Sequence, residues 1–404
     1  MIFGEYKLKP NETLENASKS IYGFPQTKEL GVLNGNVKSG DTIKYELEET
    51  KTVGETEIIT TGDIKTFRLV IGDKIVENII GYELKESLTE IKTLTINLKY
   101  DNNDFVNSLK YGKAVYFYEN GEKVFTGFIK ATPKTRTNEL KMMTIVCKSK
   151  AGLLIDSHFP LSSYPIEFNN LSFRQIVSRV AAIKAVKVNF QQGNELLIDS
   201  TYSNDFGNGV SAKIDESIMG FIVRLAHSKG LIVTDDENGN LYIFKKKETK
   251  EPFMIEEDKF NGLANVKEEL NLDSLAEEYT IFSQYKDNSG FGQARIKDFP
   301  LPISKTKILE NNTSDNLNDI AKWWLCRELG NAIKYRITIP NAVINDRKIK
   351  TGDDITLKVP SMNIDKNLVI ESIKRTVLKS QVINLTLTIP NAYNGNIPSI
   401  GDIL

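Results

Sequence analysis

The sequence predicts a multidomain protein that is mainly β with α+β parts. We expect a small βααβ unit, two related β-barrel domains, and an α+β domain inserted between those two. Two observations carry this prediction. Short β-branched and aromatic segments with turn residues between them recur in two separate stretches, and a stretch with helical periodicity divides them. The length of 404 residues fits several domains, at about 150 residues each.

Composition and charge exclude several classes of protein. Lys plus Arg number 52 against 53 for Asp plus Glu, a net charge of −1, so bulk electrostatics should not hold DNA or an anionic membrane. Two Cys and two His cannot supply a zinc motif from neighbouring positions, and we expect Cys147 and Cys326 in the core. The N-terminal residues show no signal-peptide pattern and no segment reaches 18 apolar residues, which predicts a soluble chain made in the cytoplasm.

Residues 1–48 predict the βααβ unit. A strand at Tyr6–Leu8 precedes a helix start at Asn11, and Gly23 ends that helix. A second helix follows Pro25, and a strand at 42–45 closes the unit after turn residues.

This unit resembles the LysM module. The resemblance is carried by Asn11-Glu12-Thr13-Leu14, Tyr22-Gly23, Leu33-Asn34 and Gly40-Asp41-Thr42-Ile43, with Asn-Glu where the family has Gly-Asp. In that family a groove between two strand–helix loops binds glycan. The resemblance places the groove here at Asn11, Glu12, Thr13, Leu14, Asn34, Gly35, Asn36, Val37 and Lys38. The other reading is a small docking domain that does not use glycan.

Residues 49–64 are polar and Thr-rich, which predicts a linker and a strand edge before the first β-barrel domain at 65–150. Strand candidates in that domain are 67–71, 91–100, 114–118, 123–129 and 140–147. The Asn120-Gly121 pair predicts a tight hairpin.

Residues 151–260 predict the α+β domain. Ser172 and Gln175 form a capping-box pattern, and Asp215 is the expected cap of a second helix that Gly230 ends. A hairpin follows at 230–244. His227 lies at the end of the second apolar helix, where we expect a packing role.

Residues 261–404 predict the second β-barrel domain with an inserted helix at 315–329. Asp315 is the expected cap and Gly330 the expected stop. Neighbouring helix positions cannot share one face, so we expect one ring of the Trp323-Trp324 pair in the core and the other free to reach a partner.

The two β-rich parts resemble each other. Segments 112–118, 123–129 and 142–147 agree in strand length and turn position with 352–359, 367–373 and 382–389. This agreement predicts that the two domains share an origin.

Taken in order, the elements of residues 65–393 resemble the baseplate hub proteins of contractile-tailed phages, the Mu-type tail hub family, and their relatives in tailocins and contractile injection systems. The segments that carry the resemblance are 335–342, 350–360 and 368–373 with 385–393. The resemblance implies a homotrimer with no catalysis, in which two barrels per subunit form a pseudo-six-fold ring. Such a symmetry adaptor contacts a tail tube protein above and a spike protein below, other baseplate proteins through the LysM-like domain, and DNA only as it passes through the channel. It implies assembly in the bacterial cytoplasm into a virion or phage-tail-like particle.

A search for chemistry finds no nucleophile elbow, phosphate loop or His-Glu-x-x-His motif, and the acidic pairs lie in polar surroundings. We therefore predict no catalytic residues, no cofactor and no metal. The alternative function is a LysM-anchored peptidoglycan-binding protein or cell-wall hydrolase, which would need a catalytic carboxylate or Cys/His pair. A third reading, a secreted LysM-anchored adhesin, is disfavoured by the absent signal peptide.

Overall fold

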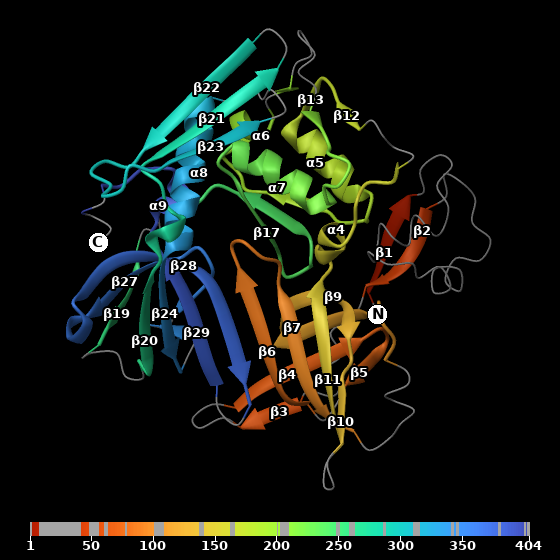
Figure 1. Cartoon of the computed structure of the whole chain (residues 1–404). Helices are drawn as coiled ribbons and strands as arrows, with labels where there is room; N and C mark the ends of the chain where they lie inside the picture. The colour runs from red at the N-terminus through yellow and green to blue at the C-terminus, as the bar shows by residue number, and fades with distance from the viewer. Residues whose placement is uncertain are drawn as a thin grey trace.

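The fold is described from a computed structural model of the chain (Figure 1). It describes residues 2–7, 42–47, 56–59, 64–76, 79–100, 109–136, 141–161, 166–199, 201–202, 210–247, 251–257, 263–285, 288–309, 316–340, 343–344, 347–378, 381–399 and 401. At the start of the chain, β1 (Ile2–Lys7) pairs antiparallel with β2 (Thr42–Leu47). The two helices expected between them and the nine groove residues Asn11–Leu14 and Asn34–Lys38 lie outside the described residues.

The first β-rich part is a run of short strands in which apolar residues alternate with polar ones. The strands are β3 (Thr56–Ile59), β4 (Ile64–Ile71), β5 (Lys74–Val76), β6 (Ile79–Ser87), β7 (Thr93–Lys99), β8 (Ala114–Glu119), β9 (Glu122–Ala131), β10 (Lys134–Arg136) and β11 (Lys141–Ser149). In β8 every second side chain is buried, which is the pattern of a sheet with one face on a core. The segment expected as linker and strand edge contributes β3, which pairs with β4.

The α+β part follows directly. Its elements are α4 (Gly152–Ile155), β12 (Glu167–Phe168), β13 (Leu171–Ser172), α5 (Phe173–Ala182), β14 (Val188–Phe190), α6 (Glu195–Ile198), β15 (Thr201–Tyr202), β16 (Val210–Ser211), α7 (Ile218–Ser228), β17 (Ile232–Asp235) and β18 (Leu241–Phe244). The hairpin β17–β18 is extended by β14, which pairs parallel with β18. The amphipathic helices α5 and α7 pack against each other and bury their apolar faces.

The second β-rich part contains one long helix. Its elements are β19 (Phe253–Glu256), β20 (Asn265–Leu270), η2 (Leu272–Ser274), β21 (Glu278–Tyr285), β22 (Asn288–Arg295), β23 (Ser304–Leu309), α8 (Leu317–Ala332), β24 (Ile333–Ile339), β25 (Val343–Ile344), β26 (Arg347–Lys348), β27 (Asp354–Val359), η3 (Pro360–Met362), β28 (Ile364–Val377), β29 (Gln381–Thr388) and α9 (Asn391–Asn394). A separate three-stranded sheet, β22-β21-β23, packs on α8.

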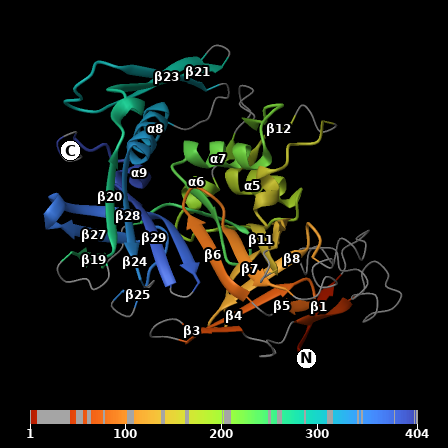
Figure 2. The ribbon, with the colours of Figure 1, turned by 60° about the horizontal axis from the view of Figure 1, so that its bottom comes forward.

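The two β-rich parts share one sheet. Fifteen described strands form it, and its main path runs β20-β24-β29-β28-β6-β7-β11-β9-β8-β4-β3. The parts lie side by side and meet where β28 pairs with β6, as both ribbon views show (Figures 1 and 2). The mainly β fold is confirmed. The expectation of separate barrels is corrected, because the described strands close neither part and hydrogen bonds instead continue from one part into the other.

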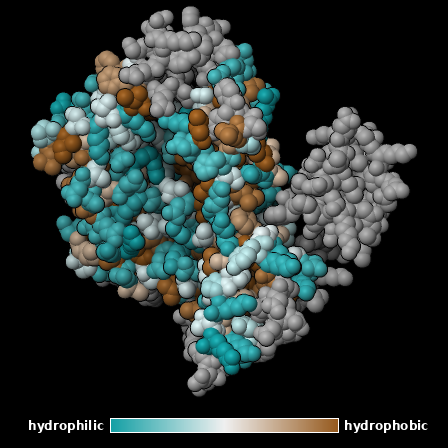
Figure 3. Space-filling model, turned by 45° about the vertical axis from the view of Figure 1, so that its right-hand side comes forward, coloured by the Kyte–Doolittle hydropathy of each residue, from teal (hydrophilic) through white to brown (hydrophobic). Residues whose placement is uncertain are grey.

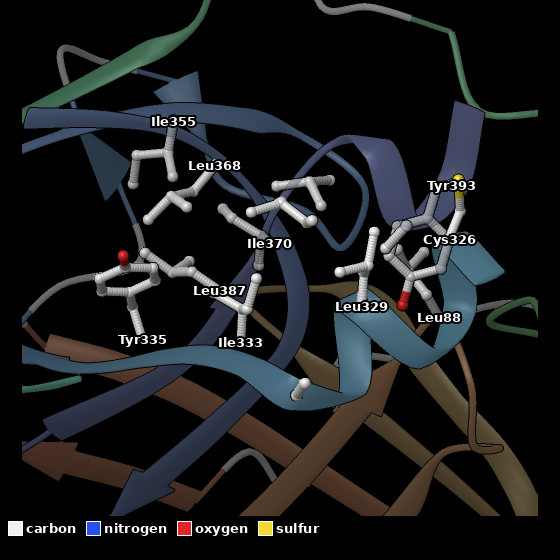
Figure 4. Close-up of a cluster of buried hydrophobic side chains, with 14 of the residues drawn as sticks. Leu88, Cys326, Leu329, Ile333, Tyr335, Ile355, Leu368, Ile370, Leu387 and Tyr393 are labelled. Carbon is white, nitrogen blue, oxygen red and sulfur yellow. The ribbon is translucent and has the colours of Figure 1, made fainter. Parts of the chain in front are cut away.

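Three buried hydrophobic clusters correspond to the three parts. One lies in the first β-rich part, between Phe67 and Cys147, with Val377 of β28 joining it. The second lies in the α+β part, includes both apolar helix faces, and is joined by Ile91 from the turn before β7. The third fills the second β-rich part, where Leu329 of α8 packs with side chains of β24, β27, β28 and β29 (Figure 4).

Local signals account for several element boundaries. Asn120 and Gly121 both have positive φ, 50° and 80°, which is the type I′ geometry predicted for the β8–β9 hairpin. The Ser172 side chain accepts from the Gln175 backbone, and the Gln175 side chain accepts from the Ser172 backbone, which confirms the capping box. Gly230, with φ 65°, follows the end of α7 as predicted.

Three cap assignments differ from the sequence prediction. Ser217, and not Asp215, caps α7 by accepting from the Gly220 backbone at 3.0 Å. Asn316 caps α8, which spans Leu317–Ala332 where the sequence predicted 315–329. Gly330 does not stop this helix. It lies against α9, where a Cβ would come within 2.3 Å of the Ala392 side chain, so close packing is what requires glycine there.

Candidate functional site

The candidate functional site is a five-strand module that occurs twice in the shared sheet. The order β6-β7-β11-β9-β8 in the first part matches β20-β24-β29-β28-β27 in the second. All four neighbouring pairs are antiparallel in each module. The similarity predicted from three strands therefore extends to five.

Backbone hydrogen bonds at the entry turn are the same in both modules. Gly112 N donates to Ile129 O at 3.0 Å, and Gly352 N donates to Ile370 O at 2.8 Å. Each isoleucine N–H bonds back to the carbonyl of the residue after the glycine, at 3.1 and 2.9 Å. Both glycines have positive φ, 77° and 90°, a conformation that L side chains rarely adopt.

A β-bulge occupies the equivalent position in both modules. Lys130 in β9 has no paired residue in β11, and Glu371 in β28 has none in β29, because the register shifts by one residue at each position. Lys130 Nζ donates to Asp156 Oδ2, just after α4, at 2.7 Å. Glu371 accepts from the hydroxyl of Tyr393 in α9 at 2.8 Å and pairs with Lys334. In both modules the side chain at the bulge thus contacts the short helix that comes next in the chain, the end of α4 after β11 and α9 after β29. The two bulged side chains nevertheless have opposite charge.

A cross-strand side-chain pair also recurs with its partners exchanged. Thr144 Oγ1 of β11 donates to Asn97 Oδ1 of β7 at 2.8 Å. In the second module Thr338 Oγ1 of β24 donates to Asn384 Oδ1 of β29, also at 2.8 Å. The registers make Thr144 equivalent to Asn384 and Asn97 equivalent to Thr338. The contact is therefore present twice, with the two residue types on opposite strands.

The junction between the modules contains a buried charge network. Arg375 of β28 donates to Glu119 Oε2 at 2.6 Å through one nitrogen and to Glu86 through another. Tyr82 donates to the other oxygen of Glu119 at 2.6 Å. The guanidinium thus bridges β28 of the second module to β6 and β8 of the first.

The network fixes the protonation of its members. Burial by itself would raise the pKa of Glu86, but Arg375 and Lys92 outweigh it and hold that pKa below its ordinary value. Burial and the neighbouring Glu119 raise the pKa of Tyr82, so its hydroxyl stays protonated and donates. The junction therefore holds a neutral donor and an ionised Glu86 around one permanent cation.

The α+β part is attached to the same junction. Lys92 N, just before β7, donates to Asp235 Oδ1 at 2.9 Å, and Thr234 Oγ1 donates to Ser87 O at 2.8 Å. Burial raises the pKa of Asp235 to about 6. Three parts of the chain thus meet around the end of β6.

Burial keeps two thiols and one imidazole in their neutral forms. Burial raises the pKa of the Cys147 and Cys326 thiols, the second to about 12, and lowers the pKa of His227 to about 4. In the described part of the chain no group of three or more His, Cys, Asp or Glu is placed to hold a metal ion. No helix among these residues is long and apolar enough to cross a membrane.

The sequence missed the buried network. Its members were not singled out because the second strand segment predicted for the second repeat, 367–373, was expected to end at 373, whereas β28 continues to Val377. The missed signal is the alternation Ile373, Arg375, Val377, which places the arginine on the inward face with two apolar residues.

No protein-family model matches the chain, and no curated protein matches it by sequence. The 43 kDa tail protein of prophage MuSo2 from Shewanella oneidensis superposes with a TM-score of 0.66 at 18% identity, covering 81% of this chain and 99% of that one. A tail protein from Neisseria meningitidis gives 0.68 at 14% identity, covering 82% and 99%.

A third similar structure is a component of the type VI secretion system of E. coli, itself described as similar to T4 bacteriophage tail proteins. It gives a TM-score of 0.53 at 10% identity, covering 82% of this chain and 79% of that one. The chain has the fold of phage tail proteins. At these identities the likeness concerns the fold alone.

Proposed function

We propose that the chain is a structural baseplate hub of a contractile phage tail or a phage-tail-like particle such as a tailocin or injection system. In this role it is a homotrimeric adaptor between a six-fold tail tube and a three-fold spike. It performs no catalysis and needs no cofactor.

The duplicated module is the observation that carries this proposal. Three chains with two equivalent modules each supply six similar modules, so a trimer matches a six-fold ring on one side and a three-fold spike on the other. The equivalence is close, because the turn hydrogen bonds and the bulge position coincide. The β28–β6 ladder and the hydrogen bonds of Arg375 join the two modules of one chain directly, which supports a ring built from paired modules.

The fold and the charge support the same role. Two tail proteins superpose over 99% of their own length, so the likeness includes the whole of each. A net charge of −1 suits a ring through which DNA passes without being held.

The remaining parts have places in this proposal. The units are the LysM-like domain at 1–48, the linker at 49–64, the first β-domain at 65–150, the α+β domain at 151–260, and the second β-domain at 261–404. The LysM-like domain serves as a joint to other baseplate proteins, with its groove at 11–14 and 34–38. The tube protein lies above the ring and the spike below it, in a particle assembled in the bacterial cytoplasm.

Solution mass and rotational symmetry test the proposal. Light scattering on the purified full chain over a range of concentrations should give a trimer of about three times 45.5 kDa. End-on class averages of that trimer by electron microscopy should show a six-fold component in addition to the three-fold one. Trimers with no six-fold component would remove the adaptor role.

A peptidoglycan sedimentation assay separates the alternative function. The hub predicts that the chain stays in the supernatant and leaves the cell walls turbid. A chain that is monomeric at every concentration and sediments with peptidoglycan would instead be a LysM-anchored wall-binding protein. Clearing of the wall suspension would make it a hydrolase.

A further inference from the structure

Two strands of the shared sheet, β10 and β20, each have one unpaired edge among the described residues. There β20 pairs only with β24, and β10, which continues the line of β9, pairs only with β11. All three residues of β10 and four of the six in β20 are exposed. The two strands lie on opposite sides of the β28–β6 junction (Figure 1). The lower end of the molecule, where Figure 1 draws β10, carries hydrophilic side chains on the face seen in Figure 3.

These two edges are the equivalents of the two strands that meet at the internal junction. The registers of β9 and β10 on β11, aligned with that of β28 on β29, make Lys134 the counterpart of Arg375. The registers of β20 on β24 and of β6 on β7 make Glu268 the counterpart of Leu84. Leu84 lies directly opposite Arg375 in the β28–β6 ladder. The same ladder built from the two open edges therefore sets Lys134 opposite Glu268.

The backbone groups on both edges have the orientation that this ladder needs. The carbonyl of Pro133 accepts from β11 at 2.9 Å, so the missing N–H of this proline also faces β11 and not the open edge. The next residue, Lys134, therefore directs its N–H and C=O outward. Asn271, directly after β20, donates to Ala332 O at 2.8 Å on the β24 side. Since facing alternates along a strand, Glu268 directs its backbone groups to the open edge.

The charges on the two edges are complementary. β10 carries Lys134 and Arg136 and no acid. In β20, Glu269 is paired with Lys267 and with a β24 arginine, which leaves Glu268 as the acid of this strand without an ion pair in the part of the chain that the structure describes. Opposite charges directly across an antiparallel ladder stabilise it, and like charges destabilise it. The internal junction likewise sets a cation of one module against carboxylates of the other.

We propose that β10 of one chain pairs antiparallel with β20 of a second copy of the same chain, and that this ladder is the contact between subunits of the ring. Lys134 lies opposite Glu268 of the next copy. Thr132 lies opposite Leu270 of that copy, whose side chain is 43% exposed in the single chain and becomes covered. The contact runs head to tail, so it closes into a ring after a whole number of copies. This inference rests on the proposed trimer and adds the strands that hold it together.

A disulfide placed across the ladder tests its register. Thr135 and Lys267 face each other at a non-hydrogen-bonded position of the proposed ladder, where Cα atoms are about 4.5 Å apart and within reach of a disulfide. Thr135→Cys/Lys267→Cys should therefore give covalent dimers and trimers on non-reducing gels after oxidation with copper phenanthroline. Thr135→Cys/Asn265→Cys moves one thiol two residues out of register, so it should cross-link at least about tenfold more slowly. The native Cys147 and Cys326 are buried and should not compete.

An exchange of charges tests the central pair by light scattering over a range of concentrations. Lys134→Glu sets two carboxylates against each other, so it should raise the concentration at which half of the chains are trimeric by about tenfold or more. Glu268→Lys should do the same, and the double variant should return to within about threefold of the wild type. Glu268 also accepts from the Tyr335 hydroxyl in its own chain, so this rescue separates a lost contact from a folding defect. Lys322→Glu makes the same charge change at an exposed position of α8 and should leave the solution mass unchanged.

The outcomes separate this ladder from the proposed function. Trimers that the in-register cysteine pair does not cross-link, or that Lys134→Glu leaves intact, would overturn the ladder and keep the trimer. Equal cross-linking of the in-register and shifted pairs would show random collision and would also overturn the ladder. Covalent species of more than three copies would support the ladder and overturn the trimeric adaptor. A chain that is monomeric at every concentration and does not cross-link would overturn both.

Discussion

The charge network at the module junction makes a sharp prediction through Arg375→Met. The side chain of Arg375 is 7% exposed, and it bridges two carboxylates from two different strands of the first module. Methionine is close in length and keeps the apolar stem, so the change removes the charge and the donors with little loss of volume. Glu119 and Glu86 then stay in place without their shared cation.

The expected cost is large because one partner is removed from a buried pair. Such changes destabilise by about 3–5 kcal/mol, since the remaining charge stays desolvated. Lys374→Met on the same strand is the matched control. Its partner is Glu83 of β6 at 2.8 Å, with side chains 43% and 39% exposed, so its loss should cost less than about 1 kcal/mol.

Hydrogen exchange is the suitable assay, because a protein of several parts is not expected to unfold in one step. Arg375→Met should speed exchange of β6 and β28 amides by roughly 10²- to 4 × 10³-fold relative to the wild type under conditions where exchange reports opening. Lys374→Met should change it less than about fivefold. Amides of α5, which lies away from the junction, provide an internal reference.

The pH dependence identifies the cause. In the wild type the pKa of Glu86 is below its ordinary value, so its stabilisation is complete above about pH 4.5 and is lost as the pH falls through the folded value. Without Arg375, burial raises the pKa of Glu86 and Lys92 alone opposes that rise. Protonation of Glu86 should therefore remove part of the destabilisation of the variant as the pH falls from 7 toward 5. The difference in amide exchange rate between variant and wild type should therefore become smaller as the pH is lowered. A difference that is the same at both pH values, or equal in the Lys374→Met control, would refute the reasoning.

Three further predictions concern the repeated module and the thiols. Gly112→Ala and Gly352→Ala should each destabilise their module by about 1–2 kcal/mol, measured by hydrogen exchange of that module's amides, because both need positive φ; no effect at one site would contradict the equivalence of the turns. A double-mutant cycle on Asn97 and Thr144 should give a coupling of about 1 kcal/mol, and the exchange of the two residues should restore most of the loss, since the second module has that arrangement. The thiol of Cys326, whose pKa burial raises to about 12, should not react with Ellman's reagent at pH 8 in the native protein and should react after unfolding; rapid native reaction would show that the α8 core opens.

Much of the fold was predictable because its signals are local. The Asn120-Gly121 turn and the Ser172 capping box depend on residues within four positions of each other, and both predictions are confirmed. The predicted C-terminal end of α8 was wrong because a glycine such as Gly330 is typical of a helix terminus in sequence. Its actual role is to admit Ala392 from 62 residues further along the chain, a contact that no local pattern reports.

The long-range pairing was not predictable from local signals. The β6–β28 ladder joins residues almost 300 positions apart and turns two expected barrels into one continuous sheet. Nothing in the isolated β6 sequence specifies that partner. The parallel pairing of β19 with β27 was unpredictable for the same reason. The alternation of apolar and polar residues shows which face of a strand is buried, but it does not show which strand pairs with it.

The candidate site was predictable in outline because duplication leaves a pattern in strand lengths and turns. Its chemistry was not, because the two copies keep backbone geometry and change side chains. Lys130 and Glu371 occupy one bulge position with opposite charge. The Thr–Asn contact keeps its length while its residues exchange strands.

This pattern of change has a consequence for any six-fold partner. Around a trimeric ring the backbone of the module would repeat six times, whereas its side chains would repeat three times, with Lys130 and Glu371 alternating. A partner ring of six identical subunits could match all six modules through strand edges and turn backbone, which are alike in the two copies. Contacts through side chains at differing positions would favour only every second subunit. We therefore expect the six-fold side of the proposed hub to be recognised through its backbone frame, and the three-fold side through the residues that distinguish one module from the other.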